Sequence, residues 1–254
     1  MLIILSPAKT LKENITPGKL EHTIPEFLSE AEQLVNTLKK YSPKRLMDLM
    51  DINPKLAELT ATRYSRWNSD FNPGNALPAI LMFNGEVYNG LKASTLGRKE
   101  LEYAQDHLRI LSGLYGILRP LDLIKAYRLE MGIPLKQGRK KDLYAYWGNR
   151  LTDSLNRELT GHKEKVLLNL ASNEYSDAVN FNKIKGKVIT CHFKEERDGK
   201  LQFITLYGKK ARGLMTRFIL ENRIDKAEDI KHFDAEGYFF NDRMSTEDEW
   251  MFSR

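Results

Sequence analysis

The sequence has almost no cysteine and no long hydrophobic run. Cys191 is the single cysteine among 254 residues, which excludes a disulfide within the chain and a peroxidase that carries its own resolving cysteine. The opening apolar segment, "MLIIL", is far shorter than the roughly 20 residues that cross a bilayer. It also lacks the basic segment and the cleavage site of a signal peptide. We therefore expect a cytoplasmic protein with no membrane partner.

Histidine is scarce as well. None of the five histidines has the spacing of a metal ligand with another histidine or with the cysteine. We therefore expect no metal site and no cofactor. Cys191 lies in the alternating run "KVITCHF", which predicts a buried position on a strand and not a reactive thiol.

Positive charge is in modest excess, and its distribution is more informative than its total. Forty Lys and Arg residues stand against 34 Asp and Glu residues, which gives a formal net charge of +6. The basic residues cluster in "SPKR", "GLYGILRPLDLIKAYR", "QGRKK" and "GKKARGLMTRF", whereas acidic residues concentrate in helix-like stretches and in "STEDE". This pattern predicts a positive surface on one side of the molecule.

The apolar pattern predicts an α/β fold of the mixed α+β kind. Buried strands are expected at 2–5, 79–83, the start of 108–118, and 165–172, and a short strand running into a helix is expected within 142–159. Helices are expected at 25–41, 43–50, 54–67, 99–107 and 208–223. The "RDGK" turn predicts a hairpin over 187–207. Since no linker or repeat interrupts the chain, we predict one domain over residues 1–254, a mixed β-sheet packed by helices.

The two short helices at about 43–66 fit a helix-hairpin-helix template, in which a tight turn and the next helix start hold a DNA phosphate. Asp51 and Asn53 occupy the two glycine positions of that turn, and both residue types tolerate left-handed backbone angles. With Ile52 and Lys55, they are the expected DNA contacts. The charge of Asp51 opposes this interpretation, and an ordinary helical hairpin remains the alternative.

The segment "LSGLYGILRPLDLIKAYRLEMG" suggests an anion site. Gly113 and Gly116 permit sharp turns after a strand, and Arg119 is held extended by the proline that follows it. Arg128 lies further along the same segment. Guanidinium groups fixed in this way suit phosphate or carboxylate recognition, although surface arginines without a ligand are the alternative.

The segment "YGKKARGLMTRF" carries further cations. Lys209, Lys210 and Arg212 are expected at and just after a helix start, where they oppose the helix dipole. A bound phosphate group would offset that cost. A solvated basic helix face is the alternative.

Polar turns follow several of the apolar runs. Lys9 follows the first strand, Asn84 and Glu86 follow residues 79–83, and Ser172 and Glu174 follow the run at 165–172. Polar groups after strands meet at one edge of a sheet in α/β folds, so we expect these to form a polar cleft. The carboxylates either act as acid/base groups or pair with the arginines, and ion pairing is the simpler interpretation.

Seven motifs, in order along the chain, give a resemblance to a known family. They are "LIILSPAKTL", "FNGEVYNGL", "LRILSGLYGILRPLDLIKAYRLEMG", "DLYAYWG", "NLASNEY", "KKARGLMTRFI" and "EGYFF". Together they resemble the YaaA family of bacterial peroxide stress proteins, formerly a family of unknown function. The resemblance implies a cytosolic protein that limits iron-dependent oxidative damage and binds double-stranded and branched DNA. It also implies an α/β fold with a helix-hairpin-helix element and a positively charged cleft.

The resemblance is carried over residue by residue. It assigns the hairpin to 51–54 and a phosphate-binding cleft to Lys9, Arg119, Arg128, Lys209, Lys210 and Arg212. No catalytic residue comes with it. The leading hypothesis is therefore a DNA-binding protein, expected to be a monomer, that contacts the phosphate backbone with little sequence preference. The alternative is an enzyme that acts on a small phosphorylated or carboxylated substrate in the same cleft, with Lys9 or Glu86 as the acid/base group.

Overall fold

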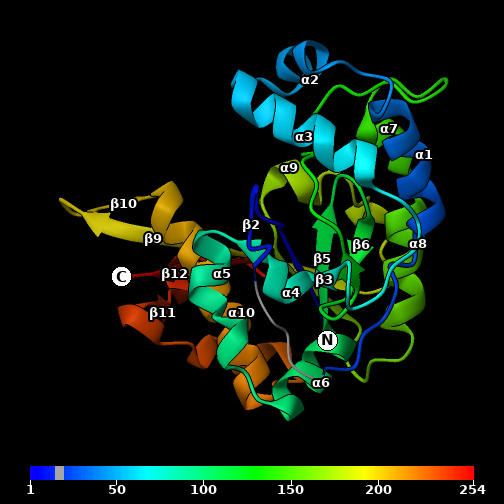
Figure 1. Cartoon of the computed structure of the whole chain (residues 1–254). Helices are drawn as coiled ribbons and strands as arrows, with labels where there is room; N and C mark the ends of the chain where they lie inside the picture. Colours follow the sequence, from blue (N-terminus) through cyan, green and yellow to red (C-terminus); the bar gives the residue numbers. More distant parts are fainter. Residues whose placement is uncertain (15–19) are drawn as a thin grey trace.

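A mostly parallel β-sheet forms the centre of the molecule, in a computed structural model that describes residues 1–14 and 20–254 (Figure 1). The strand order is β11-β12-β9-β8-β1-β5-β6, and β10 pairs with β9. The strands β1, β5, β8, β9 and β12 run parallel, whereas β6, β10 and β11 pair antiparallel. Their bounds are β1 (Leu2–Leu5), β5 (Leu108–Ser112), β6 (Gly116–Leu118), β8 (Val166–Leu170), β9 (Lys187–Arg197), β10 (Lys200–Gln202), β11 (Phe239–Phe240) and β12 (Glu249–Ser253).

Strand β1 lies between β5 and β8, and its residues are fully buried. Its apolar composition follows from this position, because a parallel strand covered on both faces has no polar side. Leu5 is in register with Ile110 and with Leu170, so the carboxyl ends of the three strands meet at one edge. From β1 the chain crosses to β5 on one side, whereas from β8 it crosses to β9 on the other. The crossing direction therefore reverses between β1 and β8.

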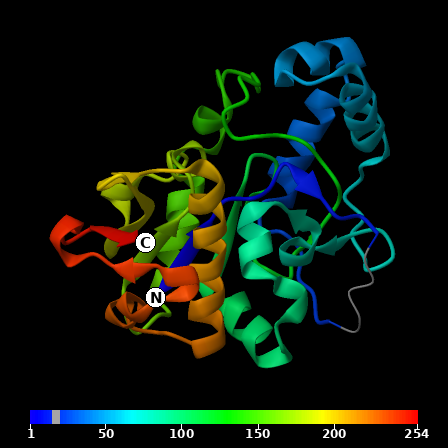
Figure 2. The same ribbon diagram turned by 90° about the vertical axis from the view of Figure 1, so that its left-hand side faces the viewer.

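Ten α-helices in the described part of the chain surround the sheet. They are α1 (Leu28–Leu38), α2 (Pro43–Met50), α3 (Pro54–Arg66), α4 (Ala79–Met82), α5 (Glu86–Leu91), α6 (Arg98–His107), α7 (Leu143–Trp147), α8 (Arg150–Leu159), α9 (Asn173–Ser176) and α10 (Thr205–Asn222). None of these helices is both long and apolar enough to span a membrane. Figures 1 and 2 both place the α2–α3 pair beyond the carboxyl end of β1.

Helices α5 and α10 pack side by side, with their backbones in direct contact (Figure 2). A Cβ atom on Gly213 would overlap the carbonyl oxygen of Val87, and one on Gly90 would overlap that of Lys210. Only glycine allows such an approach. The glycines in "EVYNGL" and "ARGLMT" thus place the middle of α10 against the start of α5.

Two of the predicted strands are wrong. Residues 79–83 form helix α4 followed by the short strand β4 (Phe83–Asn84), which pairs with β2 (Thr10–Leu11). Residues 143–147 form helix α7, because the Asp142 carboxylate caps its start by accepting from the Ala145 N–H at 2.7 Å. An apolar run this short fits a buried helical turn as well as a strand, so the pattern alone could not separate the two.

The predicted hairpin is confirmed over 187–202, with Asp198 and Gly199 in left-handed conformations at its turn, but residues 205–207 belong to the next helix. Helix α10 follows, but it begins at Thr205, earlier than predicted. Lys209 therefore lies beyond the first turn, where the helix dipole has little effect. The helix dipole therefore gives no reason to place a phosphate at these cations. Any anion there would be bound by the side chains themselves and by the groups around them. A further small sheet pairs β3 (Leu77–Pro78) with β7 (Leu123–Ile124).

Candidate functional site

A pocket of about 540 Å³ lies at the carboxyl ends of β1 and β8. This is the point at which the crossing direction reverses, the usual ligand position in open α/β sheets. Its walls are the loops after the two strands, the start of α5 and one face of α10. The predicted site residues that line it are Lys9, Asn84, Glu86, Ser172, Glu174, Lys209 and Arg212.

Direct hydrogen bonds join the two loops at the floor of the pocket. The Ser6 hydroxyl accepts from the Ser172 N–H at 2.8 Å and lies 3.2 Å from the Ser172 hydroxyl. The Tyr88 hydroxyl donates to the Ser6 carbonyl at 3.1 Å and so ties α5 to the same loop. These contacts fix the positions of the side chains that follow each strand.

Lys9 projects from the loop after β1 and is held by an acid. Strand β2 pairs with β4, and this pairing keeps the Lys9 loop next to Asn84. The Lys9 ammonium pairs with Glu130, whose other oxygen lies 2.8 Å from Arg128 Nη2. One carboxylate thus bridges two predicted cleft cations, and it lowers the positive charge that either offers to a ligand.

Lys209 is exposed at the pocket, whereas Arg212 is partly buried. Its Nε is buried without a hydrogen-bond partner, and no described residue forms an ion pair with its guanidinium. Burial lowers the pKa of Arg212, because the charged form is poorly solvated there. The guanidinium lines the pocket together with Lys209. An anion in the pocket would supply the missing partner.

The two acidic side chains of the pocket do not pair with arginines, contrary to the simpler interpretation of the sequence. Glu86 Oε1 accepts from Asn89 Nδ2 at 3.1 Å, and Glu174 Oε1 accepts from the Gly132 N–H at 3.2 Å. Within the described ranges, neither carboxylate has a basic partner within ion-pair distance. Both remain available to a ligand.

Three predicted cleft residues do not line the pocket, namely Arg128, which pairs with Glu130 as described above, Arg119 and Lys210. Arg119 follows β6, which runs antiparallel to β5 and returns the chain to the opposite edge of the sheet. It lines a separate hollow with Asp122 and Glu158. Lys210 points to the other side of α10, where its ammonium pairs with Glu236.

The α2–α3 turn is a tight helical hairpin in which Asp51, but not Asn53, takes a left-handed conformation, so it matches the helix-hairpin-helix template at one of the two glycine positions. Asp51 ends α2 in a left-handed conformation with φ 48°, and it is exposed. Asn53 is extended and caps α3, its side chain accepting from the Leu56 N–H at 2.9 Å. Ile52 packs partly on the core, and Lys55 is exposed. The turn lies outside the pocket, at the same end of the molecule.

Two residues that shape the site were not predicted from the sequence. Glu130 and Ser6 were not singled out, yet each contacts a predicted residue. The one available signal was "YRLE", where a carboxylate follows Arg128 closely enough to neutralise it. Ser6 stands in "SPAKT", but nothing in the sequence indicates a bond to Ser172.

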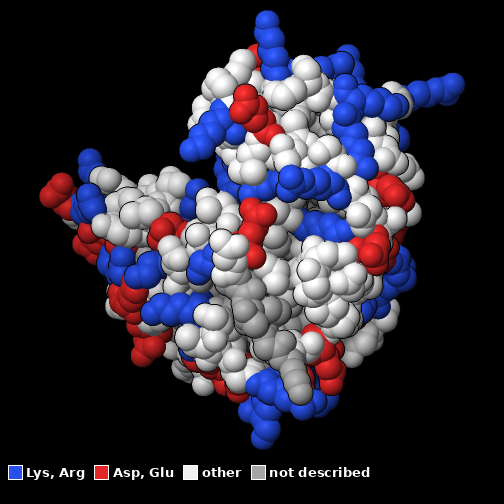
Figure 3. All heavy atoms as spheres, viewed as in Figure 1, with Lys and Arg blue, Asp and Glu red and all other residues white. Residues whose placement is uncertain are grey.

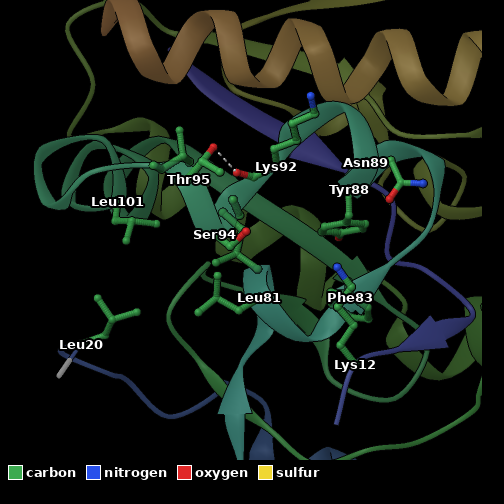
Figure 4. A pocket seen from close by; sticks show the side chains of 13 residues that line it. Lys12, Leu20, Leu81, Phe83, Tyr88, Asn89, Lys92, Ser94, Thr95 and Leu101 are labelled. Carbon is green, nitrogen blue, oxygen red and sulfur yellow. Dashed lines mark hydrogen bonds between the residues drawn. The ribbon is translucent and has the colours of Figure 1, made fainter. Parts of the chain in front are cut away.

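A second hollow, of about 850 Å³, lies against α4, α5 and the 3-10 helix η1 (Ala93–Thr95). Figure 4 shows Lys12 and Lys92 at its border and mainly apolar side chains around it, among them Leu20, Leu81, Phe83 and Leu101. No residue predicted from the sequence lines it.

Figure 3 shows how charge is distributed on one face. Lys and Arg predominate on the lobe at the top, which carries α2 and α3, whereas the arm with β9 and β10 carries both signs. The surface is hollowed between the lobe and the arm. Because acidic side chains interrupt the positive ones, a continuous basic cleft remains a prediction.

Among the described residues, no group of three or more His, Cys, Asp or Glu side chains is placed to hold a metal ion.

The comparison with protein families agrees with the order of the sequence motifs. A family model described as peroxide stress protein YaaA matches residues 1–244, which is nearly the whole chain. The matched region includes both loops of the pocket, the α2–α3 pair and all of α10. The chain therefore belongs to the YaaA family of peroxide stress proteins.

Proposed function

We propose that this peroxide stress protein binds double-stranded and branched DNA through phosphate contacts and thereby helps to limit iron-dependent oxidative damage. One observation carries the proposal. The exposed α2–α3 turn and the exposed pocket cations Lys9 and Lys209 lie at the same end of the molecule. Two separate phosphate-contacting elements suit a branched DNA, whose arms diverge.

The hairpin supports backbone contact. The first N–H groups of a helix have no carbonyl partner within the helix, and Asn53 satisfies only that of Leu56. A phosphate at this helix start would accept from the remaining N–H of Lys55 and meet its ammonium group. Asp51 reduces the attraction, so the pocket cations are needed to complete the surface.

The proposed surface is narrower than the one inferred from the sequence. Arg119 is left out because it lies at the opposite sheet edge, and Lys210 because Glu236 neutralises it. Arg128 shares Glu130 with Lys9, so its guanidinium is not free for a phosphate. Lys9 itself is included because its side chain is 60% exposed.

The salt dependence of binding tests the proposal. Each neutralised phosphate contributes about −0.9 to the slope of log affinity against log salt for B-DNA. The variant Lys9→Gln, Lys55→Gln, Lys209→Gln should therefore bind a short duplex more weakly and reduce the slope by about 3. Fluorescence anisotropy between about 50 and 200 mM salt, with a duplex and a four-way junction, measures both quantities.

A second variant tests whether the loss of affinity depends on where the cations lie. Arg119→Gln, Lys210→Gln removes two cations that lie outside the proposed surface and should retain most of the affinity. Salt-independent binding would contradict the proposal, as would equal losses in the two variants. In peroxide-treated cells, the wild-type chain should lower iron-dependent strand breaks and the triple variant should not. If the wild-type chain and the triple variant protected cells equally, DNA binding would not be the basis of the protection.

A further inference from the structure

The interior of the pocket presents two cations from one face of α10. Lys209 and Arg212 are three residues apart, a spacing that brings side chains together on a helix surface. Neither forms an ion pair within the described part of the chain, unlike Lys9, Lys210 and Arg217. The buried Nε of Arg212 also lacks an acceptor. Such a donor is costly unless a ligand satisfies it.

The donors around these cations favour a group with several oxygens. The hydroxyl groups of Ser6 and Ser172 meet at the floor, and Asn84 lines the wall. Together with the ammonium and the guanidinium, they offer more donors than the two oxygens of a carboxylate can accept. A phosphomonoester brings three terminal oxygens and nearly two negative charges at neutral pH.

The carboxylates of Glu86 and Glu174 indicate what the phosphate is attached to. One oxygen of each is engaged, and no donor from the described residues reaches the second. A carboxylate beside a phosphate site suits a sugar hydroxyl, as in the nucleotide sites of α/β folds. The pocket therefore offers separate groups for a phosphate and for hydroxyls.

The size of the pocket limits how the phosphate can enter. A volume of about 540 Å³ suits a small ligand. A phosphodiester within a strand carries chain on both sides, so it cannot reach the partly buried guanidinium of Arg212. A phosphomonoester carries chain on one side only.

We propose that this pocket binds a phosphomonoester on a hydroxyl-bearing group, from either a free sugar phosphate or the phosphorylated end of a DNA strand. The proposal rests on the same pocket as the proposed function and specifies the ligand of its interior. It assigns phosphate contact to Arg212 and Lys209, and hydroxyl contact to Glu86 and Glu174.

Isothermal titration calorimetry with ribose 5-phosphate tests the chemistry. Ribose 5-phosphate should bind the full chain, whereas ribose and gluconate, which lack the phosphate, should bind far more weakly. Arg212→Gln should lower the affinity by about tenfold or more, since a hydrogen bond to a charged group is lost. Lys210→Gln, on the same helix but outside the pocket, should change it by less than about twofold. Thermal unfolding of each variant confirms that it is folded.

Duplexes with 5′-phosphate or 5′-hydroxyl ends separate the two sources. If the DNA end is the source, 5′-phosphates should strengthen binding to the wild type and not to Arg212→Gln. If a free sugar phosphate is the source, the ends should make no difference while ribose 5-phosphate still binds. Failure of ribose 5-phosphate and of 5′-phosphate ends to bind would overturn the proposal, as would gluconate binding equally well. Duplexes with 5′-hydroxyl ends carry no phosphomonoester, so their binding tests only the proposed function. Failure of the phosphomonoester proposal can therefore be told apart from failure of the proposed DNA binding.

Discussion

At the scale of single residues, Arg212 is the most costly side chain of the site. A guanidinium that is partly removed from water and has no counter-ion destabilises the folded protein, because neither solvent nor protein compensates its charge. Proteins retain such groups where a ligand supplies the missing partner. The stability of the ligand-free protein should therefore improve when this charge is removed.

We expect Arg212→Met to raise the free energy of unfolding by about 1 kcal/mol in the absence of ligand, while abolishing phosphate binding. Methionine fills a similar volume and brings no charge into the site. Urea denaturation at neutral pH measures the change, with Lys210→Met as the control. Because Lys210 pairs with Glu236, that control should gain no stability. A marked loss of stability in Arg212→Met would mean that Arg212 has a structural partner.

Much of the pocket could be predicted at this scale, but its ion pairs could not. Lys9, Ser172 and Glu174 follow apolar runs that are parallel strands in the structure. Residues that follow parallel strands meet at one edge of the sheet, so their proximity could be predicted. Arg119 follows a strand too, but the antiparallel direction of β6 reverses its position. The pairing of Glu130 with Lys9 depends on how distant loops fold, which the sequence does not reveal.

At the scale of secondary structure, the contact between α5 and α10 builds one wall of the pocket. Gly90 and Gly213 bring the two backbones together, and this sets Glu86 beside the cations of α10. The contact leaves no room for even one methyl group. Close packing of this kind responds strongly to small changes in volume.

Gly213→Ala should lower the free energy of unfolding by about 3 kcal/mol or more, because its Cβ would overlap the Val87 carbonyl oxygen. Gly161→Ala is a matched control. Its Cβ would lie 3.5 Å from the nearest atom, the Glu158 carbonyl oxygen, in ordinary van der Waals contact. We expect a change within about 0.5 kcal/mol there. Denaturant titration of both variants decides, and equal stabilities would contradict the close contact.

A helix with several apolar turns was predictable, whereas the short apolar run at 79–83 was not. The apolar spacing of residues 25–41 identified α1, whose Ala31, Leu34, Val35 and Leu38 are buried, although the helix itself is shorter. The five-residue run at 79–83 did not carry enough pattern to exclude a helix. Its conformation depends on partners far along the chain, since Ile80 N–H donates to the Pro120 carbonyl at 3.0 Å.

At the scale of the whole molecule, the two edges of the sheet differ in their electrostatics. The carboxyl edge holds the pocket and its cations. At the amino edge, His107 and His162 lie next to the Met1 amino group, with ring centroids 4.8 Å apart. Burial, together with the nearby positive amino group, lowers the pKa of His162 to about 4. Burial also lowers the pKa of His107, against the opposing charge of Asp225.

These shifts predict an acid-sensitive fold. An unfolded histidine takes up its proton near pH 6.5, before the folded His162 does near pH 4, so protonation favours the unfolded state. The free energy of unfolding should therefore fall as the pH drops from about 6.5 to about 4. Urea denaturation at a series of pH values measures this slope. His162→Gln should flatten it and the exposed His22→Gln should not, and a slope unchanged in His162→Gln would refute the assignment.

The strand order lay beyond the sequence analysis. Apolar runs identified β1, β5 and β8 as buried strands, yet nothing in them indicates that β1 is central or that β12 lies parallel to β9. Pairing between distant strands is set by the packing of the complete chain. The sheet edge that holds the pocket could be predicted, but its place between β1 and β8, where the crossing direction reverses, followed only from the structure.

The central place of β1 has a consequence for synthesis on the ribosome. The strand emerges well before its partners, which begin only at Leu108 and Leu167. Until those segments leave the exit tunnel, an apolar strand with two unsatisfied edges is exposed to other nascent chains. The core can therefore form only after most of the chain has been synthesised. Newly made copies are then the molecules most exposed to aggregation and most dependent on chaperones.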